Sequence, residues 1–231
     1  MALNERFRAA RGFALKHLAV SALIASLCAA LTFGLWYPYP YSELAGGREL
    51  FALLISVDVV IGPLLSLAVY NPKKLRIVLW RDLATIFMLQ LGALSYGIYT
   101  MAQARPAWLA FERDSFRVVA VPDIDATQLS QAPTDMSRLS WTGPRTIGVK
   151  LLDGSDPEFL QSIELATQGI HPAFRPQRWV HYDVQREQVI RRSKPLSELK
   201  RRHREHSPMI DDAVRQSGLA ETDLGYLPLI S

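Results

Sequence analysis

Three long apolar runs within the first 101 residues constrain the fold more than any other feature of this sequence. Leu18–Trp36 has 19 residues without a charge, Leu50–Tyr70 has 21 residues with only Asp58 charged, and Leu83–Met101 has 19 uncharged residues. A helix needs about 20 apolar residues to cross ~30 Å of hydrocarbon. We therefore expect three membrane-spanning helices. The alternative, a buried helical hairpin of a soluble protein, fits three such closely spaced runs poorly.

The charges are unevenly divided between the two parts of the chain. Residues 1–101 hold nine Lys and Arg and five Asp and Glu, whereas residues 102–231 hold 17 of each kind, so the net charge of +4 lies in the first part. A nucleic-acid-binding protein should carry its basic excess on a folded soluble module, so nucleic acid is not expected as a partner. The single cysteine, Cys28, excludes an intramolecular disulfide framework and Cys₄ or Cys₂His₂ zinc sites.

The basic residues around the spans predict their orientation. They are Arg6, Arg8, Arg11 and Lys16 before the first span, Arg48 between the first two, and Lys73, Lys74, Arg76 and Arg81 between the last two. Eight against one predicts a cytoplasmic N-terminus and a cytoplasmic second loop. Three crossings then predict that residues 102–231 lie in the periplasm of a Gram-negative bacterium, with the anchor in the inner membrane.

A cleaved signal peptide is the alternative for the first run, because it also begins with basic residues followed by an apolar stretch. The run is longer than the usual ~7–15 apolar residues of a signal peptide. A lipoprotein signal at Cys28 would require a small residue where Leu27 stands. We therefore expect the first span to be retained.

The sequence after residue 101 predicts a small domain of mixed secondary structure. The expected elements are two strands over 107–121 with a turn near 113–115, a short helix over 123–131, a strand over 146–152, a helix opened by a Ser155–Glu158 capping box and ended at Gly169, a strand over 179–190, helices over 195–205 and 207–218, and a short apolar segment over 224–230. The predicted fold class is an α-helical membrane anchor of three transmembrane helices, residues 1–101, followed by a small α+β periplasmic domain, residues 102–231.

Asp58 is the only charged residue inside a predicted span. A carboxyl group within the bilayer costs several kcal/mol unless it is neutral, paired or hydrated, so it marks a functional or helix-contact site. Pro63 also releases the carbonyl of Val59 from the helical hydrogen-bond ladder. Gln90 lies at a similar depth in the third span, so an Asp58–Gln90 bond worth ~0.6–2 kcal/mol is a purely structural alternative. The sequence leaves both interpretations open.

Small residues at four-residue spacing allow helices to approach closely in lipid. Ala93 and Gly97 form such a pair in the third span, and similar stripes occur in the first. They serve either packing among the three spans or contact with a partner helix. The candidate partner-binding residues are accordingly Asp58, Gly62, Pro63, Gln90, Ala93 and Gly97.

The chemistry-bearing residues outside the spans form no recognisable catalytic motif. His203 and His206 have the spacing of metal ligands, but they lie in the basic run Lys200–Arg204, whose positive field opposes a cation. That run is expected to be a solvated helix face that meets lipid headgroups or an acidic partner. We therefore expect no enzyme activity, no metal, no cofactor and no small-molecule substrate.

Several short motifs resemble one known family. They are Val57–Leu65, Arg81–Ala84, Leu89–Leu91, Tyr96–Tyr99, Ala104–Pro106 and Phe111–Val119, with Thr142–Pro144 and Tyr226–Leu229 further on. In order and spacing they look like the TfpX/TfpZ family of type IV pilin accessory proteins, most densely over residues 50–122. The resemblance implies an inner-membrane chaperone that stabilises a cognate pilin before it enters the pilus. Many members of that family extend past the Leu-Pro-Leu segment with further strand-like sequence, whereas this sequence ends at Ser231.

The partners implied by this resemblance are a type IV pilin subunit and the lipid bilayer. Pilin helices, as the resemblance implies, carry an acidic residue near their start, to which a neutral Asp58 could donate a hydrogen bond. The competing hypothesis is a membrane-anchored periplasmic enzyme or sensor. A deep pocket with convergent polar groups would favour that hypothesis, whereas an exposed apolar edge or patch would favour a chaperone.

Overall fold

The computed structural model describes residues 2–231, and the chain divides into two compact units. The first comprises Met1–Pro106 with Trp141–Gly143, and the second comprises Ala107–Ser140 with Pro144–Ser231. The boundary thus falls five residues after the one predicted at residue 101. The first unit consists of long apolar helices, whereas the second is organised around a packed β-sheet.

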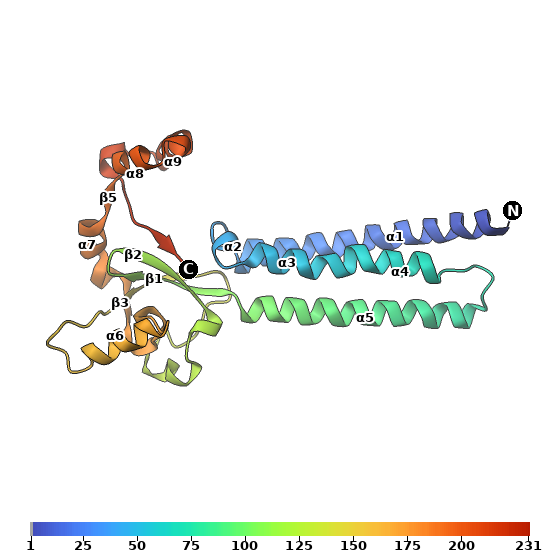
Figure 1. The fold of residues 1–231 in the computed structure, drawn as a ribbon, viewed down its shortest axis with the longest axis horizontal. Helices are drawn as coiled ribbons and strands as arrows, with labels where there is room; N and C mark the ends of the chain where they lie inside the picture. The colour runs from blue at the N-terminus through green and yellow to red at the C-terminus, as the bar shows by residue number, and fades with distance from the viewer. Residues whose placement is uncertain (1) are drawn as a thin grey trace. The chain divides into compact units, whose positions relative to one another are not determined.

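The first unit is a bundle of three long helical segments (Figure 1). They are α1 (Ala2–Leu31) with the π-helical turn η1 (Thr32–Trp36), then α3 (Gly47–Ser56), the π-helical segment η2 (Val57–Ile61) and α4 (Gly62–Val69) in one run, and finally α5 (Arg76–Gln103). A short helix, α2 (Tyr41–Leu44), precedes α3. All three segments are long and apolar enough to cross a membrane, which is the architecture of a multi-pass membrane protein.

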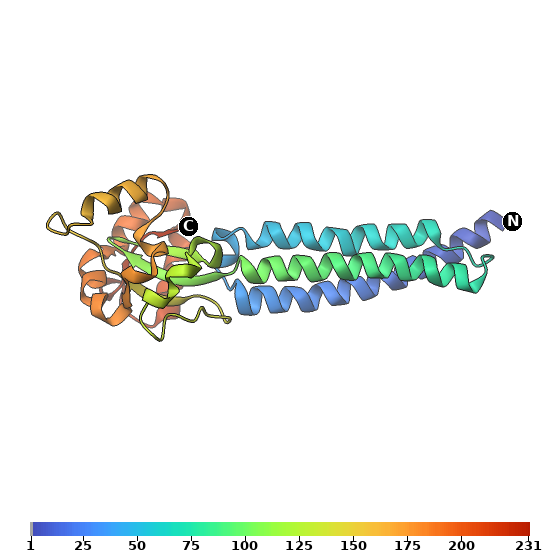
Figure 2. The same ribbon diagram turned by 90° about the horizontal axis from the view of Figure 1, so that it is seen from below.

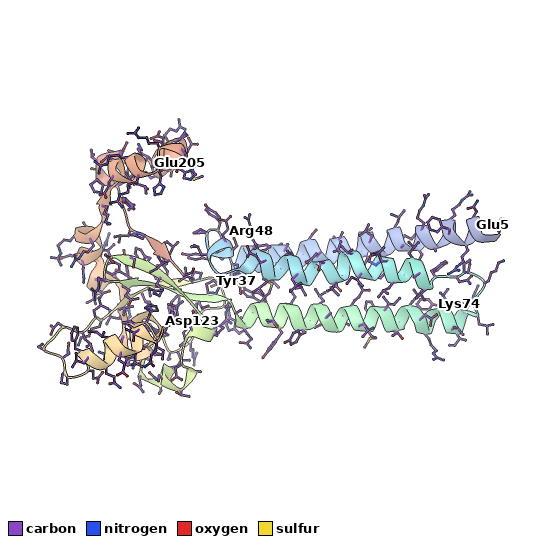
Figure 3. The ribbon with its side chains drawn as sticks, in the orientation of Figure 1. Glu5, Tyr37, Arg48, Lys74, Asp123 and Glu205 are labelled. Atoms are coloured by element: carbon purple, nitrogen blue, oxygen red, sulfur yellow. The ribbon has the colours of Figure 1, made fainter. Side chains whose placement is uncertain are left out.

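The three segments do not pack on one another equally. The middle segment is central, because α1 packs along α4 while α5 packs against both α3 and α4. Helices α1 and α5 contact each other far less than either contacts the middle segment. All three segments run along a common direction in Figure 2. Glu5 and Lys74 mark one end of this bundle, and Tyr37 and Arg48 mark the other (Figure 3).

The first helix begins well before the predicted span. It starts at Ala2, not at Leu18, because the basic segment that precedes the apolar run is rich in good helix formers. This extension also packs: the Phe13 ring stacks on Tyr70 at 4.8 Å, and Arg6 donates to the carbonyl of Ala68 at 3.2 Å. Hydropathy locates the part of a helix that suits lipid, whereas the helix itself continues as long as the backbone finds partners.

The second unit contains a five-stranded mixed sheet with strand order β4-β3-β1-β2-β7. The strands are β1 (Pro106–Glu112), β2 (Ser115–Ala120), β3 (Arg145–Val149), β4 (Trp179–His181) and β7 (Leu229–Ile230). Strand β1 runs parallel to β3, β2 runs parallel to β7, and β3 runs antiparallel to β4. The predicted turn between the first two strands is present, with Arg113 at a left-handed φ of 63°.

The main hydrophobic cluster of this unit is centred on two tryptophans. Trp108 and Trp179 are almost completely buried, and their ring centroids lie 5.3 Å apart. The indole of Trp179 donates to the carbonyl of Ala173 at 2.8 Å, so its polar atom is satisfied. Ile147 and Val149 of β3 complete the centre of the cluster.

Four helices and a small second sheet complete the unit. The helices are α6 (Phe159–Thr167), α7 (Tyr182–Arg192), α8 (Leu196–Arg202) and α9 (Ser207–Ser217), and the two-stranded sheet pairs β5 (Lys194–Pro195) with β6 (Gly225–Tyr226). The predicted α+β class is therefore correct. The helix predicted over 123–131 is instead two 3₁₀ turns, Val121–Asp123 and Ala126–Gln131.

The strand predicted over 179–190 is wrong beyond its first three residues. Only Trp179–His181 is extended, and α7 follows immediately. The alternation of apolar residues predicted a strand here, but the backbone is helical. The side chain of Gln185, not the backbone of a longer strand, bonds to the end of β3. Its amide accepts from the N–H of Val149 at 3.0 Å and donates to the carbonyl of Val149 at 2.8 Å.

The capping box predicted at Ser155 and Glu158 does not form. The Ser155 hydroxyl bonds to Asp153, and the Glu158 carboxylate pairs with Arg178 at 2.5 Å. Helix α6 begins at Phe159 without a side-chain cap. Its predicted end is correct, since Gly169 adopts a φ of 86° directly after the last turn.

Candidate functional site

Asp58 lies in the π-helical segment in the middle of the second span. In this segment the N–H of Gly62 donates to the carbonyl of Val57, five residues back, instead of to the usual partner four residues back. The same register assigns the carbonyl of Asp58 to Pro63, which has no N–H to donate. The sequence predicted that Pro63 leaves the carbonyl of Val59 without its helical donor. In the π-helical register, this vacancy (the carbonyl without a donor) falls instead on Asp58.

Gln90 of α5 fills this vacancy. Its side-chain amide donates to the backbone carbonyl of Asp58 at 3.2 Å. The two side chains predicted to form an interhelical bond are therefore neighbours, but the bond goes to the backbone of Asp58. Within the described residues, the Asp58 Oδ1 and Gln90 Oε1 atoms are buried and have no hydrogen-bond partner.

Gly62 and Gly97 permit close approach between α5 and the middle segment. A Cβ on Gly62 would collide with the side-chain amide of Gln90, and a Cβ on Gly97 would collide with the side chain of Leu54. Both glycines thus serve packing inside the bundle, which for Gly97 is one of the two roles that the sequence left open. Pro63 is buried beside Gly62, and Ala93 is half-buried on α5.

A small cavity of about 110 Å³ adjoins Asp58 between α1, the middle segment and α5. Its polar lining consists of His17, Ser21, Asp58 and Gln90, and the rest of the wall is apolar. Asp58 is 7% exposed, so the helices of the bundle enclose most of this residue and shield it from the surrounding lipid. A cavity of this size exceeds the space that a water molecule needs, and its polar atoms could bind water.

Sequence reasoning missed two polar residues here: His17, which lines this cavity, and its partner Ser66. The Nδ1 atom of His17 lies 2.6 Å from the Ser66 hydroxyl, which ties α1 to α4. Ser66 is fully buried, and it follows Asp58 and Gly62 at successive four-residue steps. That spacing places all three on one helix face, a signal that could have been read from the sequence.

A second set of polar contacts lies at the other end of the bundle. The buried hydroxyl of Tyr37 donates to the carbonyl of Met101 at 3.0 Å. Burial raises the pKa of Tyr37 to about 12, although the nearby Arg105 acts in the opposite direction. Arg105 donates to the carbonyl of Ala102 at 2.6 Å and lies 3.8 Å from the Trp141 ring centroid. These contacts join the ends of α1 and α5 and the 141–143 segment.

Two members of the basic run 200–204, Lys200 and Arg202, are paired within their own unit. Lys200 forms ion pairs with Asp211 and Glu221 at 2.6 and 2.7 Å, and Arg202 pairs with Glu198. The His203 and His206 rings lie 6.4 Å apart, and each is 3.8 Å from the Glu205 carboxylate. Over residues 2–231, no group of three His, Cys, Asp or Glu side chains has the geometry to hold a metal ion.

These features define a class of protein: a multi-pass membrane anchor whose helices are joined by buried polar contacts, carrying a separate α+β domain. A family model described as Fimbrial assembly protein FimB matches residues 5–46. The chain is 31% identical over 229 residues to a fimbrial assembly protein of serogroup E1 from Dichelobacter nodosus, covering 99% of this chain and 89% of the relative. It is 32% identical over 230 residues to the serogroup I protein of that organism, with the same coverage.

The chain therefore belongs to the family of fimbrial assembly proteins. A third relative, from serogroups C1 and C2 of Dichelobacter nodosus, is 38% identical over 129 residues, which are 56% of this chain and 98% of the relative. These matches support a fimbrial assembly family but not the TfpX/TfpZ name suggested by the sequence motifs. No solved structure matches the chain.

Proposed function

We propose that this protein is an inner-membrane accessory protein that binds and stabilises a cognate type IV pilin subunit before pilus assembly. The observation that carries the proposal is similarity to fimbrial assembly proteins over 99% of this chain, which includes the membrane bundle and the α+β unit alike. A pilin awaiting assembly presents an apolar helix in the membrane and a folded head outside it. Two linked contacts, one for each part, would bind the pilin more tightly than either alone.

The proposed orientation places the N-terminus and the loop after α4 in the cytoplasm and the α+β unit in the periplasm. The asymmetry of basic residues around the three spans supports this orientation. A periplasmic α+β unit would meet the pilin head on the side of the membrane where the pilus is built.

The proposed membrane contact is centred on Asp58 and Gln90, which line the cavity, while Gly62, Pro63, Ala93 and Gly97 shape the helix packing around it. Two buried acceptor atoms without partners among the described residues, Asp58 Oδ1 and Gln90 Oε1, support this assignment. Leaving such atoms unsatisfied inside a bilayer is costly. A polar group on an incoming helix would relieve that cost if it entered the cavity beside Asp58.

Pilin abundance in the host bacterium tests the proposal. Deleting the gene should lower the steady-state pilin level without changing the pilin transcript, and the tagged full-length protein should co-purify with pilin from membranes. Unchanged pilin abundance together with normal piliation would contradict the proposal and favour the membrane-anchored enzyme or sensor.

A further inference from the structure

A groove of about 630 Å³ opens between α1, the end of α4 and the start of α5. It exists because α1 and α5 both pack on the middle segment but scarcely on each other. Phe13 and Lys16 line it from α1, Tyr70 lies at the end of α4, and Trp80, Leu83 and Phe87 line it from α5. The stacked rings of Phe13 and Tyr70 form part of its wall.

The chemistry of the groove changes along its length. Lys16, Tyr70 and Trp80 stand where the three apolar runs end, at the level where hydrocarbon meets headgroups. Lysine extends its ammonium group toward headgroups at this depth, and Tyr and Trp settle there because one end of each ring is polar. Farther into the bundle the lining is mostly apolar, with Leu83 and Phe87, and its polar members His17 and Ser66 are paired with each other at 2.6 Å.

The charge at the mouth of the groove is also one-sided. The groove residues that the structure describes include Lys16 but no carboxylate, and Lys16 forms no ion pair with any residue of the described chain. A cation above an apolar channel complements an amphiphile with an anionic head and a hydrocarbon tail. Basic pockets between transmembrane helices bind anionic lipid headgroups in this way.

We propose that this groove binds an anionic phospholipid, with its phosphate at Lys16 and one acyl chain along Leu83 and Phe87. The acyl chain fills space that the three helices leave open and gains van der Waals contacts with both walls of the groove. The groove opens nearer the headgroups than the cavity beside Asp58, and His17, Val20 and Phe87 line both. The phosphate at Lys16 and the proposed pilin contact at Asp58 thus lie at different depths of the bundle, while the inner end of the groove adjoins the cavity.

Native mass spectrometry of the full-length protein tests the site, with phosphatidylglycerol or phosphatidylcholine added in equal amounts. The wild type should retain phosphatidylglycerol preferentially. Lys16→Gln should lower this preference about fivefold, which corresponds to ~1 kcal/mol per basic residue near anionic lipid. Lys73→Gln is the matched control, because Lys73 lies at the same end of the bundle but does not line the groove. Equal retention of the two lipids by the wild type, or equal losses in both variants, would overturn the proposal.

A photo-crosslinking residue at Leu83 separates lipid from a partner helix as the occupant. In native membranes, cross-links to lipid support the proposal, and a cross-link to another protein at this position as the dominant product overturns it. The Ala84→Phe variant should fill the groove and reduce retention of both lipids, with the helical content unchanged by circular dichroism. Undiminished lipid retention by a folded Ala84→Phe variant would also contradict the site.

Discussion

At the scale of single residues, the π-helical register around Asp58 explains the geometry of the bundle centre. The register transfers the carbonyl left free by Pro63 to Asp58, and Gln90 satisfies it from the neighbouring helix. The backbone of Asp58 thus holds the helices together, while its carboxyl group is not needed for that bond. The structural bond thus falls on the backbone of Asp58, whereas the proposed pilin contact falls on its carboxyl group.

This separation predicts opposite effects for two substitutions. Gln90→Leu leaves the Asp58 carbonyl without its donor, so it should destabilise the bundle by ~0.6–2 kcal/mol and lower the amount of the protein in membranes. Asp58→Leu keeps the carbonyl bond, so the protein should remain abundant while the pilin level falls. Asp58→Asn retains a polar donor and should preserve the pilin level.

Immunoblots of membranes for both proteins measure these effects. If Asp58→Leu depletes the protein itself, the carboxyl group is structural. If Asp58→Leu leaves both proteins at wild-type levels, Asp58 does not contact the pilin.

Tyr37 allows a test of the polar contacts at the other end of the bundle. Tyr37→Phe should lower the free energy of unfolding in detergent by ~1 kcal/mol, because the Met101 carbonyl loses its donor. Tyr39→Phe is the control, because Tyr39 is 76% exposed. The pKa of Tyr37 is raised from 10.0 to about 12 in the folded protein, so its contribution is complete below pH 10 and is lost as the pH rises toward 12.

The Tyr37→Phe variant should lack this alkaline loss when unfolding is followed by circular dichroism against pH. An equal loss in Tyr39→Phe and Tyr37→Phe would assign the alkaline effect to other groups.

At the scale of elements, the packing of α5 against its neighbours depends on which way its small residues face. Gly97 meets Leu54 of α3, whereas Gly92 on the same helix has nothing within 4 Å of an added Cβ. Both lie in an apolar helix, and only their surroundings differ. A stripe of small residues therefore gives information about packing only when the neighbouring helix is known.

The two glycines form a matched pair for substitution. Gly97→Leu should destabilise the bundle by ~1–3 kcal/mol, because the new side chain overpacks the contact with α3. Gly92→Leu should leave stability unchanged or raise it, since leucine has the higher helix propensity. Thermal unfolding in detergent compares them, and equal effects of the two substitutions would rule out a specific close contact at Gly97.

At the scale of the whole molecule, the uneven charge and hydropathy divide the chain into two chemically different parts. The positive excess lies in residues 1–101, which hold the apolar spans, whereas residues 102–231, which include the α+β unit, are balanced in charge. Basic residues flanking the spans control insertion into a membrane, so the same distribution that separates the units also predicts their sidedness.

Reporter fusions test this sidedness. A reporter active only in the periplasm should be active when fused after Ser231 and inactive when fused after Lys74. A cytoplasmic reporter at the same two positions should give the complementary result. Activity of the periplasmic reporter after Lys74, with none after Ser231, would reverse the proposed orientation.

The sequence by itself determined the features that depend on local composition. Apolar run length gave the three spans, the turn at Arg113 gave the β1–β2 hairpin, and Gly169 and Gly218 ended their helices. Each of these follows from the preferences of residues close together in the chain, so no distant contact was needed to predict it.

Only the tertiary structure decided the features that depend on a partner distant in the chain. Glu158 pairs with Arg178 instead of closing a capping box, and Gln185 bonds to Val149 from a helix that alternation predicted as a strand. Gln90 bonds to the carbonyl of Asp58 because a π turn changes which carbonyl Pro63 leaves free. A polar side chain with two possible hydrogen-bond partners bonds to the one that lies within reach. For residues distant in the sequence, the packed fold determines which partner that is.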